Sequence, residues 1–192
     1  MRLFIAVNLL EESREEIRGH LGPLEAAAQT CHADVRWVRP DQFHLTVRFL
    51  GEFPEEAVPR LAETLHEALE EVAAFPLTLQ GFGCFPMRGM PHALWIGVAQ
   101  GQAELTGLGG RVEEALMRIG VEKERRPFLV HLTVGRIRFT RDGNQLRRLL
   151  SSASSPAIGP LTIQTIDIMQ SVLNAADAGY TCLHHIPLKE CR

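Results

Sequence analysis

The tetrapeptide HLTV occurs twice in this chain, within FHLTVRFL at residues 43–50 and within HLTVGRI at residues 131–137. The two copies start 87 positions apart. In both, polar and apolar residues alternate, which predicts a half-buried β-strand. An identical four-residue match in two strand-like stretches indicates an internal repeat.

Side chains on a strand alternate between its two faces. His44, Thr46 and Arg48 are therefore expected on one face of the first strand, and His131 and Thr133 on the matching face of the second. Taken singly, each strand also fits a histidine with a purely structural role. The threonine beside it would then be present because threonine favours β-strands. The duplication favours two histidine–threonine faces that meet in a shared cleft.

The rest of the chain alternates predicted strands with helices. The repeated strands sit in similar settings and no linker divides them, so we predict an α+β fold. Residues 1–192 are expected to be a single domain of two interleaved lobes, each supplying one of the strands. Further strands are predicted at residues 2–9, 35–38, 75–81, 93–98, 161–170 and 180–188, and helices at 12–28 (broken at Gly22–Pro23), 55–72, 105–119 and 144–150.

Composition excludes several classes of protein. With 45% apolar and 22% charged residues, the 192-residue chain is globular rather than disordered or fibrous. No apolar stretch approaches the ~20 residues that span a bilayer, and the N-terminus lacks the features of a signal peptide. Four cysteines without a CxxC motif or a zinc-type Cys/His spacing argue against disulfides and structural zinc, and fit a cytoplasmic protein. The adjacent His184 and His185 point to opposite faces of a strand and are not expected to form a ligand pair.

The net charge of −3 argues against a protein that coats nucleic acid. The charge is uneven, however: residues 1–96 carry 8 basic and 14 acidic side chains, against 12 and 9 in residues 97–192. Seven arginines and one acid lie between Arg125 and Arg148. This segment is either a solvated basic face or a local site for an anion.

Two imidazoles suit the cleavage of a phosphodiester without a metal. Histidine titrates near pH 6.5, so one ring can take a proton from the attacking oxygen while the other gives one to the leaving oxygen. Threonine hydroxyls can donate hydrogen bonds to phosphate oxygens, and an arginine fork matches a phosphate in a bidentate manner. The residues alone do not say which histidine is the acid.

Five segments together resemble a known family. They are RLFIAV at the N-terminus, VRWVRPDQFHLTVRFLGE at 35–52, ALWIGV at 93–98, RPFLVHLTVGR at 126–136 and IMQSVLNAADAGYTCL at 168–183. These segments are similar to the RNA 2′,3′-cyclic phosphodiesterases, or 2′-5′ RNA ligase-like proteins, of the two-histidine (2H) phosphoesterase superfamily.

The resemblance implies a bilobal, pseudo-two-fold fold with antiparallel sheets flanked by helices around a central cleft. It also implies a phosphoric diester hydrolase that opens RNA or nucleotide 2′,3′-cyclic phosphates to 2′-phosphates without a metal or cofactor, with weak 2′-5′ RNA ligation. The expected partners are RNA ends or nucleotides bearing a 2′,3′-cyclic phosphate, with no membrane, and the protein is expected to be a monomer.

By family position, His44 is the general acid, His131 the general base, and Thr46 and Thr133 hold the phosphate. The family's arginine, five residues after the second histidine, falls on Arg136. An odd offset would turn Arg136 to the opposite face, so a bulge or strand end at Gly135 is required. In the first motif the same offset falls on Phe49. The residue before the second histidine, commonly proline in the family, is Val130, and little effect is expected.

Two other functions remain open: a non-catalytic RNA- or nucleotide-binding protein, and a 2H hydrolase of another small cyclic or 2′-5′ phosphodiester. Aromatic rings stack on single-stranded bases, so three rings that otherwise pack as core or cleft wall are candidates for a base. Three arginines near the second motif are candidates to guide the RNA strand. These side chains are Trp37, Trp95 and Phe128, and Arg125, Arg126 and Arg138.

Overall fold

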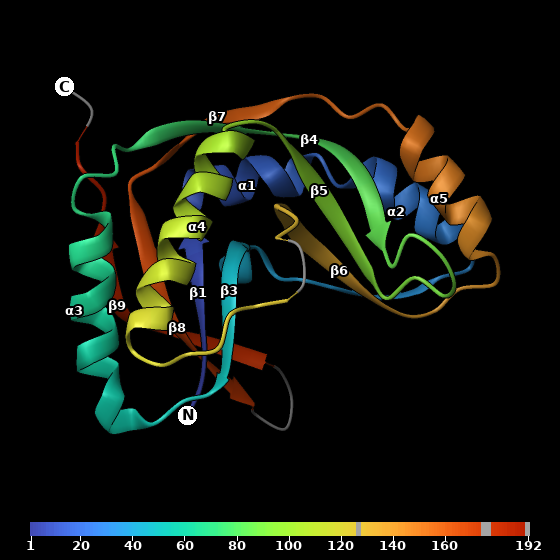
Figure 1. Ribbon diagram of the computed structural model, residues 1–192. Coiled ribbons are helices and arrows are strands. Elements are labelled where there is room, and N and C mark those ends of the chain that lie inside the picture. The colour runs from blue at the N-terminus through green and yellow to red at the C-terminus, as the bar shows by residue number, and fades with distance from the viewer. Residues whose placement is uncertain (126–127, 174–177, 191–192) are drawn as a thin grey trace.

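The computed structural model describes residues 1–125, 128–173 and 178–190. Nine described strands pair antiparallel in one strongly curved sheet, which Figure 1 shows with helices packed on it. The predicted α+β class is therefore confirmed. The strands are β1 (Arg2–Asn8), β2 (Asp34–Trp37), β3 (His44–Glu52), β4 (Phe75–Phe85), β5 (Ala93–Gln100), β6 (His131–Phe139), β7 (Ile158–Ile163), β8 (Thr165–Leu173) and β9 (Ala178–Pro187).

The order of strands brings the two HLTV segments together. Along the sheet the order is β7-β4-β5-β6-β3-β1-β8-β9, and β2 pairs with β6. The first HLTV begins β3 and the second begins β6, so segments far apart in the sequence are neighbours at the middle of the sheet. They pair antiparallel at Leu45 and Leu132, both fully buried.

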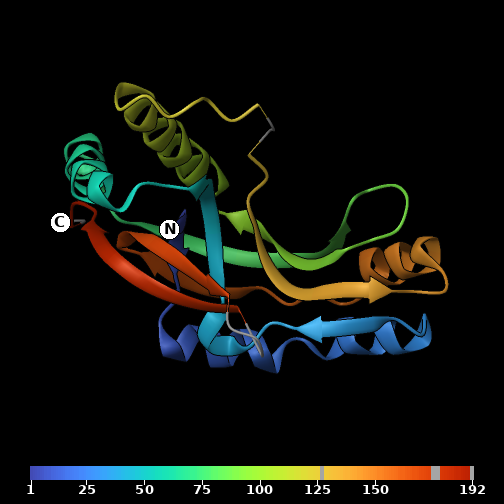
Figure 2. The same cartoon turned by 90° about the horizontal axis from the view of Figure 1, so that it is seen from below.

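Helices cover the sheet through apolar stripes. In α3, the residues Leu61, Leu65 and Leu69 recur at helical spacing and are fully buried. Figure 2 shows α3 and α4 on one side of the strands and α1 and α2 on the other, while α5 packs on α2 and β4. The helices are α1 (Glu11–Gly19), α2 (Gly22–Thr30), α3 (Val58–Leu69), α4 (Gln102–Arg118) and α5 (Gly143–Ser152).

The predicted break in the first helix is confirmed. The chain leaves α1 at Gly19 and re-enters helix at Gly22, with Pro23 in the first turn of α2. Proline lacks the backbone N–H that a helix interior needs, but the first turn leaves that donor unused.

One predicted strand is wrong. Residues 161–170 are not a single strand, because the chain changes partners at Gln164: β7 pairs with β4, and β8 pairs with β1 several strands away. The alternation of apolar residues indicates extended chain but does not identify the neighbouring strand. Within the described ranges, no helix has the length and apolar character needed to cross a membrane.

Candidate active site

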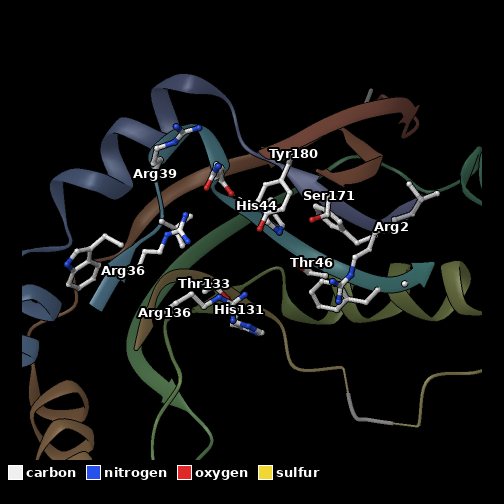
Figure 3. Close-up of a pocket in the computed structure, with 17 residues that line it drawn as sticks. Arg2, Arg36, Arg39, His44, Thr46, His131, Thr133, Arg136, Ser171 and Tyr180 are labelled. Atoms are coloured by element: carbon white, nitrogen blue, oxygen red, sulfur yellow. Dashed lines mark hydrogen bonds between the residues drawn. The ribbon is translucent and has the colours of Figure 1, made fainter. Parts of the chain in front are cut away.

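The pairing of β3 with β6 sets the two histidine–threonine faces beside each other. Counting outward from the Leu45–Leu132 pair, His44 stands opposite Thr133 and Thr46 opposite His131. The five predicted site residues, His44, Thr46, His131, Thr133 and Arg136, all line one pocket of about 490 Å³. Figure 3 shows their side chains gathered around it.

A bulge in β6 brings Arg136 to the pocket. Thr133 pairs with Trp95 and Gly135 pairs with Leu94, so Val134 is an extra residue in β6. The extra residue reverses the alternation of faces, which places Arg136 on the face of His131 and Thr133. The sequence required a bulge or strand end at Gly135. The structure has a bulge one position earlier, at Val134.

The first motif carries a matching bulge, which overturns one prediction. Thr46 pairs with Ala6 and Arg48 pairs with Ile5, so Val47 is the extra residue of β3. Arg48 consequently leaves the face of His44 and forms an ion pair with Glu113 of α4 at 2.9 Å. Phe49, 62% exposed, lines the pocket instead.

Each histidine is held by the same backbone contact. The Nδ1–H of His44 donates to the carbonyl of Gln42 at 2.8 Å, and that of His131 donates to the carbonyl of Leu129 at 2.7 Å. A carbonyl only accepts hydrogen bonds, so the proton of each neutral ring is on Nδ1. The Nε2 atom of both rings is left with a lone pair for acid–base chemistry.

Burial and positive charge favour the neutral form of both rings. Burial lowers the pKa of His44 and of His131, although the bonds to Gln42 and Leu129 act in the opposite direction. The guanidinium of Arg136 lowers the pKa of both rings further, and Arg14 and His131 add to the effect on His44. A bound anion would oppose this effect by favouring the imidazolium.

Aromatic rings pack against both histidines. The ring centroid of His44 lies 5.0 Å from that of Phe4 and 5.1 Å from that of Tyr180, and His131 lies 4.9 Å from Phe85. The edge-on contacts of Tyr180 and Phe85 fix ring orientation. Sequence reasoning missed Tyr180, although it is the chain's single tyrosine and stands in one of the family-like segments.

The pocket is more basic than the sequence suggested, and its charge has a different origin. Arg2, Arg36 and Arg39 line it together with Arg136, although the first three belong to the acidic half of the chain. Arg36 and Arg136 are direct partners across β2 and β6. Like charges in that position repel each other, and an anion between them relieves the repulsion.

Two of the arginines predicted to guide the RNA strand lie outside the pocket. Arg125 and Arg138 do not line the pocket, and Arg138 forms an exposed ion pair with Asp34 at 3.9 Å. Arg126 lies outside the described residues. Of the seven arginines clustered in the sequence, Arg136 lines the pocket, and the pocket's other arginines come from the first part of the chain.

Of the three aromatic candidates for stacking, Trp37 lines the pocket. Trp95 packs on Phe85, with ring centroids 5.2 Å apart, and covers Gly83. Phe128 contacts Gly109 of α4. Trp95 and Phe128 therefore have the packing role expected by default from the sequence.

Known proteins resemble this chain over nearly its whole length. The family model described as LigT like Phosphoesterase matches residues 12–95, which include the first HLTV motif. An RNA 2′,3′-cyclic phosphodiesterase of Archaeoglobus fulgidus is 34% identical over 173 residues, covering 90% of this chain and 92% of the relative. One from Thermus thermophilus is 38% identical over 147 residues, covering 71% and 68%.

Solved structures show the same fold. The crystal structure of a protein from Thermus thermophilus matches with a TM-score of 0.71 and 26% identity, covering 98% of both chains. Escherichia coli LigT complexed with 3′-AMP matches with a TM-score of 0.70 and 25% identity, covering 97% of both chains. The resemblance stated from the sequence is confirmed, and this chain belongs to the LigT-like phosphoesterase family.

Proposed function

We propose that this protein hydrolyses the 2′,3′-cyclic phosphate ends of RNA or nucleotides to 2′-phosphates. The observation that carries the proposal is the pair of histidines in one basic pocket, each with Nδ1 bonded to a backbone carbonyl. The relatives from Archaeoglobus fulgidus and Thermus thermophilus, both named RNA 2′,3′-cyclic phosphodiesterase, support the choice of substrate.

In the proposed mechanism, Nε2 of His131 accepts a proton from water as the water oxygen attacks phosphorus. A new P–O bond forms and the bond from phosphorus to the 3′ oxygen breaks. Protonated His44 gives its Nε2 proton to the departing 3′ oxygen, which leaves a 2′-phosphate and a 3′-hydroxyl. Exchange of one proton with solvent returns both rings to their starting forms.

Three further side chains hold the phosphate in this proposal. The hydroxyls of Thr46 and Thr133 donate hydrogen bonds to its non-bridging oxygens, and Arg136 binds it with two parallel N–H groups. The negative charge of the phosphate stabilises the imidazolium of His44, against the burial and the arginine charge that lower its pKa.

The same groups carry the proposed 2′-5′ ligation. A 5′-hydroxyl of a second RNA takes the place of water, loses its proton to His131 and attacks the cyclic phosphate. The 3′ oxygen again leaves with the proton of His44, and the product is a 2′-5′ phosphodiester. A 5′-hydroxyl oligonucleotide added to the hydrolysis assay should yield a minor joined product.

The direct test is incubation of the purified protein with a nucleoside 2′,3′-cyclic phosphate in excess chelator. We expect the 2′-phosphate as product, at the same rate with and without the chelator. Binding without turnover would favour the non-catalytic alternative, and turnover that the chelator abolishes would contradict the mechanism. Turnover confined to other cyclic or 2′-5′ phosphodiesters would point to the second alternative.

The histidine variants test the assigned chemistry. His44→Ala and His131→Ala should each lower kcat by about 10²- to 10⁴-fold, the usual contribution of a positioned acid or base. His66→Ala, on the exposed surface of α3, is the matched control and should keep the parent rate. Rates within a few-fold of the parent for either pocket variant would contradict the roles.

A further inference from the structure

A second cluster of reactive side chains lies on β8 and β9, beside a cavity of about 390 Å³ next to the catalytic pocket. Asp167, Cys182 and His185 each offer one potential ligand atom, and these atoms lie within 4.8 Å of one another. The residues come from two neighbouring strands, and Asp167 is the direct partner of His185.

The cluster exists because of a third bulge. Cys182 and His185 are three positions apart, so strand alternation alone would place them on opposite faces. Cys182 pairs with Met169 and His184 pairs with Ile168, which makes Leu183 an extra residue of β9. The bulge reverses the alternation, so Cys182 and His185 share a face while His184 takes the other.

The distance from sulfur to nitrogen in the cluster is that of a zinc site. The Sγ atom of Cys182 lies 3.6 Å from each ring nitrogen of His185. Zinc bonds of ~2.3 Å to sulfur and ~2.0 Å to nitrogen, at tetrahedral angles, separate those ligands by about 3.5 Å. The Nδ1–H of His185 donates to Oδ1 of Asp167 at 2.7 Å. A metal bound to both atoms would replace that proton and hold the two atoms about 3.3 Å apart.

The carboxylate is already oriented and the site is open to solution. Asn8 donates from Nδ2 to Oδ2 of Asp167 at 2.6 Å, an outer contact of the kind that orients metal ligands. The side chain of Asp167 is 1% exposed, whereas that of His185 is 69% exposed. An ion can therefore enter from the His185 side and meet a fixed buried negative charge.

We propose that Asp167, Cys182 and His185 form a binding site for a thiophilic divalent cation, with Zn²⁺ as the class that a sulfur, nitrogen and oxygen set fits best. Water would complete the coordination of the bound ion. The three proposed ligands take no part in the proposed hydrolysis, although His44 also lines the cavity beside them. It differs from the expectation, drawn from cysteine spacing, that the chain lacks a zinc site.

Binding requires the thiolate form of Cys182. When Zn²⁺ binds, the proton passes to solvent and the metal charge offsets those of the thiolate and the carboxylate. The cation therefore removes the repulsion between the two anionic ligands.

The test is titration of tag-free, metal-stripped protein with Co²⁺, whose bond to a thiolate gives an ultraviolet charge-transfer band. We expect saturation near one equivalent in the parent protein, and loss of the band in Cys182→Ser and His185→Ala. His184→Ala, the neighbour on the opposite face, is the matched control and should keep the band. No band in the parent, or an equal band in the Cys182 and His185 variants, would overturn the proposal.

Thermal unfolding gives a second readout that does not depend on a spectrum. A ligand that binds only the folded state raises Tm. Zn²⁺ should therefore raise the Tm of the parent and of His184→Ala, but not that of Cys182→Ser. An equal rise in Cys182→Ser would place the ion elsewhere. Because hydrolysis is measured in chelator, failure of either proposal leaves the other standing.

Discussion

At the scale of single residues, the site depends on the atoms that surround two imidazoles. A carbonyl two positions earlier accepts a hydrogen bond from the Nδ1–H of each ring, and an aromatic ring at about 5 Å fixes the tilt of the imidazole. Arg136 faces both rings and carries a fixed positive charge. The properties of His44 and His131 are therefore coupled through one arginine.

Arg136 should bind the phosphate through the geometry of its fork as well as its charge. Arg136→Lys keeps the charge but loses the two parallel hydrogen bonds, so kcat/KM should fall about 10- to 100-fold. Arg138→Lys, two positions along β6 and outside the pocket, should stay within two-fold of the parent. Steady-state kinetics on a cyclic phosphate check this, and equal losses in both variants would contradict it.

The pH dependence should reveal the charge of Arg136 directly. Burial and the guanidinium hold the pKa of His44 and His131 below the ordinary 6.5, so NMR titration of the free protein should show both midpoints there. In Arg136→Ala the penalty on the imidazolium is smaller, so both midpoints should move to higher pH. The acid limb of the kcat/KM profile should also move to higher pH, because the catalytic base of the variant becomes protonated at a higher pH than that of the parent. Unchanged midpoints would refute the coupling.

At the scale of elements, bulges decide which side chains reach a site. The extra residues Val47, Val134 and Leu183 each reverse the alternation of their strand. The bulge in β6 brings Arg136 to the catalytic pocket and that in β3 sends Arg48 away from it. The bulge in β9 sets Cys182 beside His185.

The tight packing at the β6 bulge predicts the effect of a single methyl group. A Cβ on Gly135 would lie 2.9 Å from Val35 and 3.3 Å from the ring of Trp37, which lines the pocket. Gly135→Ala should destabilise the protein by about 1–3 kcal/mol, the usual cost of overpacking. It should also raise KM through displacement of Trp37.

The control for this variant is Gly107→Ala, in α4, where a Cβ meets nothing within 4 Å. Alanine is favoured over glycine inside a helix, so this change should stabilise by about 0.5–1 kcal/mol. Urea unfolding followed by circular dichroism measures both variants. A stability of Gly135→Ala equal to that of the parent would contradict the proposed packing.

At the scale of the whole molecule, a net charge of −3 coexists with a basic pocket. Four arginines from β1, the β2 region and β6 converge there, and the fold rather than the chain order assembles them: Arg2, Arg36, Arg39 and Arg136. The division into two lobes, each supplying one histidine, stays a prediction. The Leu45–Leu132 pair marks where those lobes would join.

The converging arginines predict a dependence on salt. For a trinucleotide with a 2′,3′-cyclic end, log kcat/KM should fall linearly with log salt concentration, with a slope of about −0.7 for each phosphate contacted. A mononucleoside cyclic phosphate, which offers one phosphate, should give a shallower slope. Identical slopes for the two substrates would mean that the other phosphates of the chain do not touch the arginines.

The sequence by itself determined the strands and helices, with the exception of residues 161–170, because hydrophobic periodicity reports local burial. It also determined His44, Thr46, His131 and Thr133 as one set, because a duplicated motif on a strand fixes which side chains share a face. Arg136 followed from the family position together with the need for a bulge at Gly135.

Only the tertiary structure decided which other side chains meet at the sites. Arg2, Arg36, Arg39 and Tyr180 enter the pocket from distant parts of the chain, and Arg48 leaves its expected face. Strand order and bulges depend on packing between segments far apart in sequence, which no local pattern encodes. Local periodicity therefore gave the elements and their faces, and long-range pairing gave the neighbours.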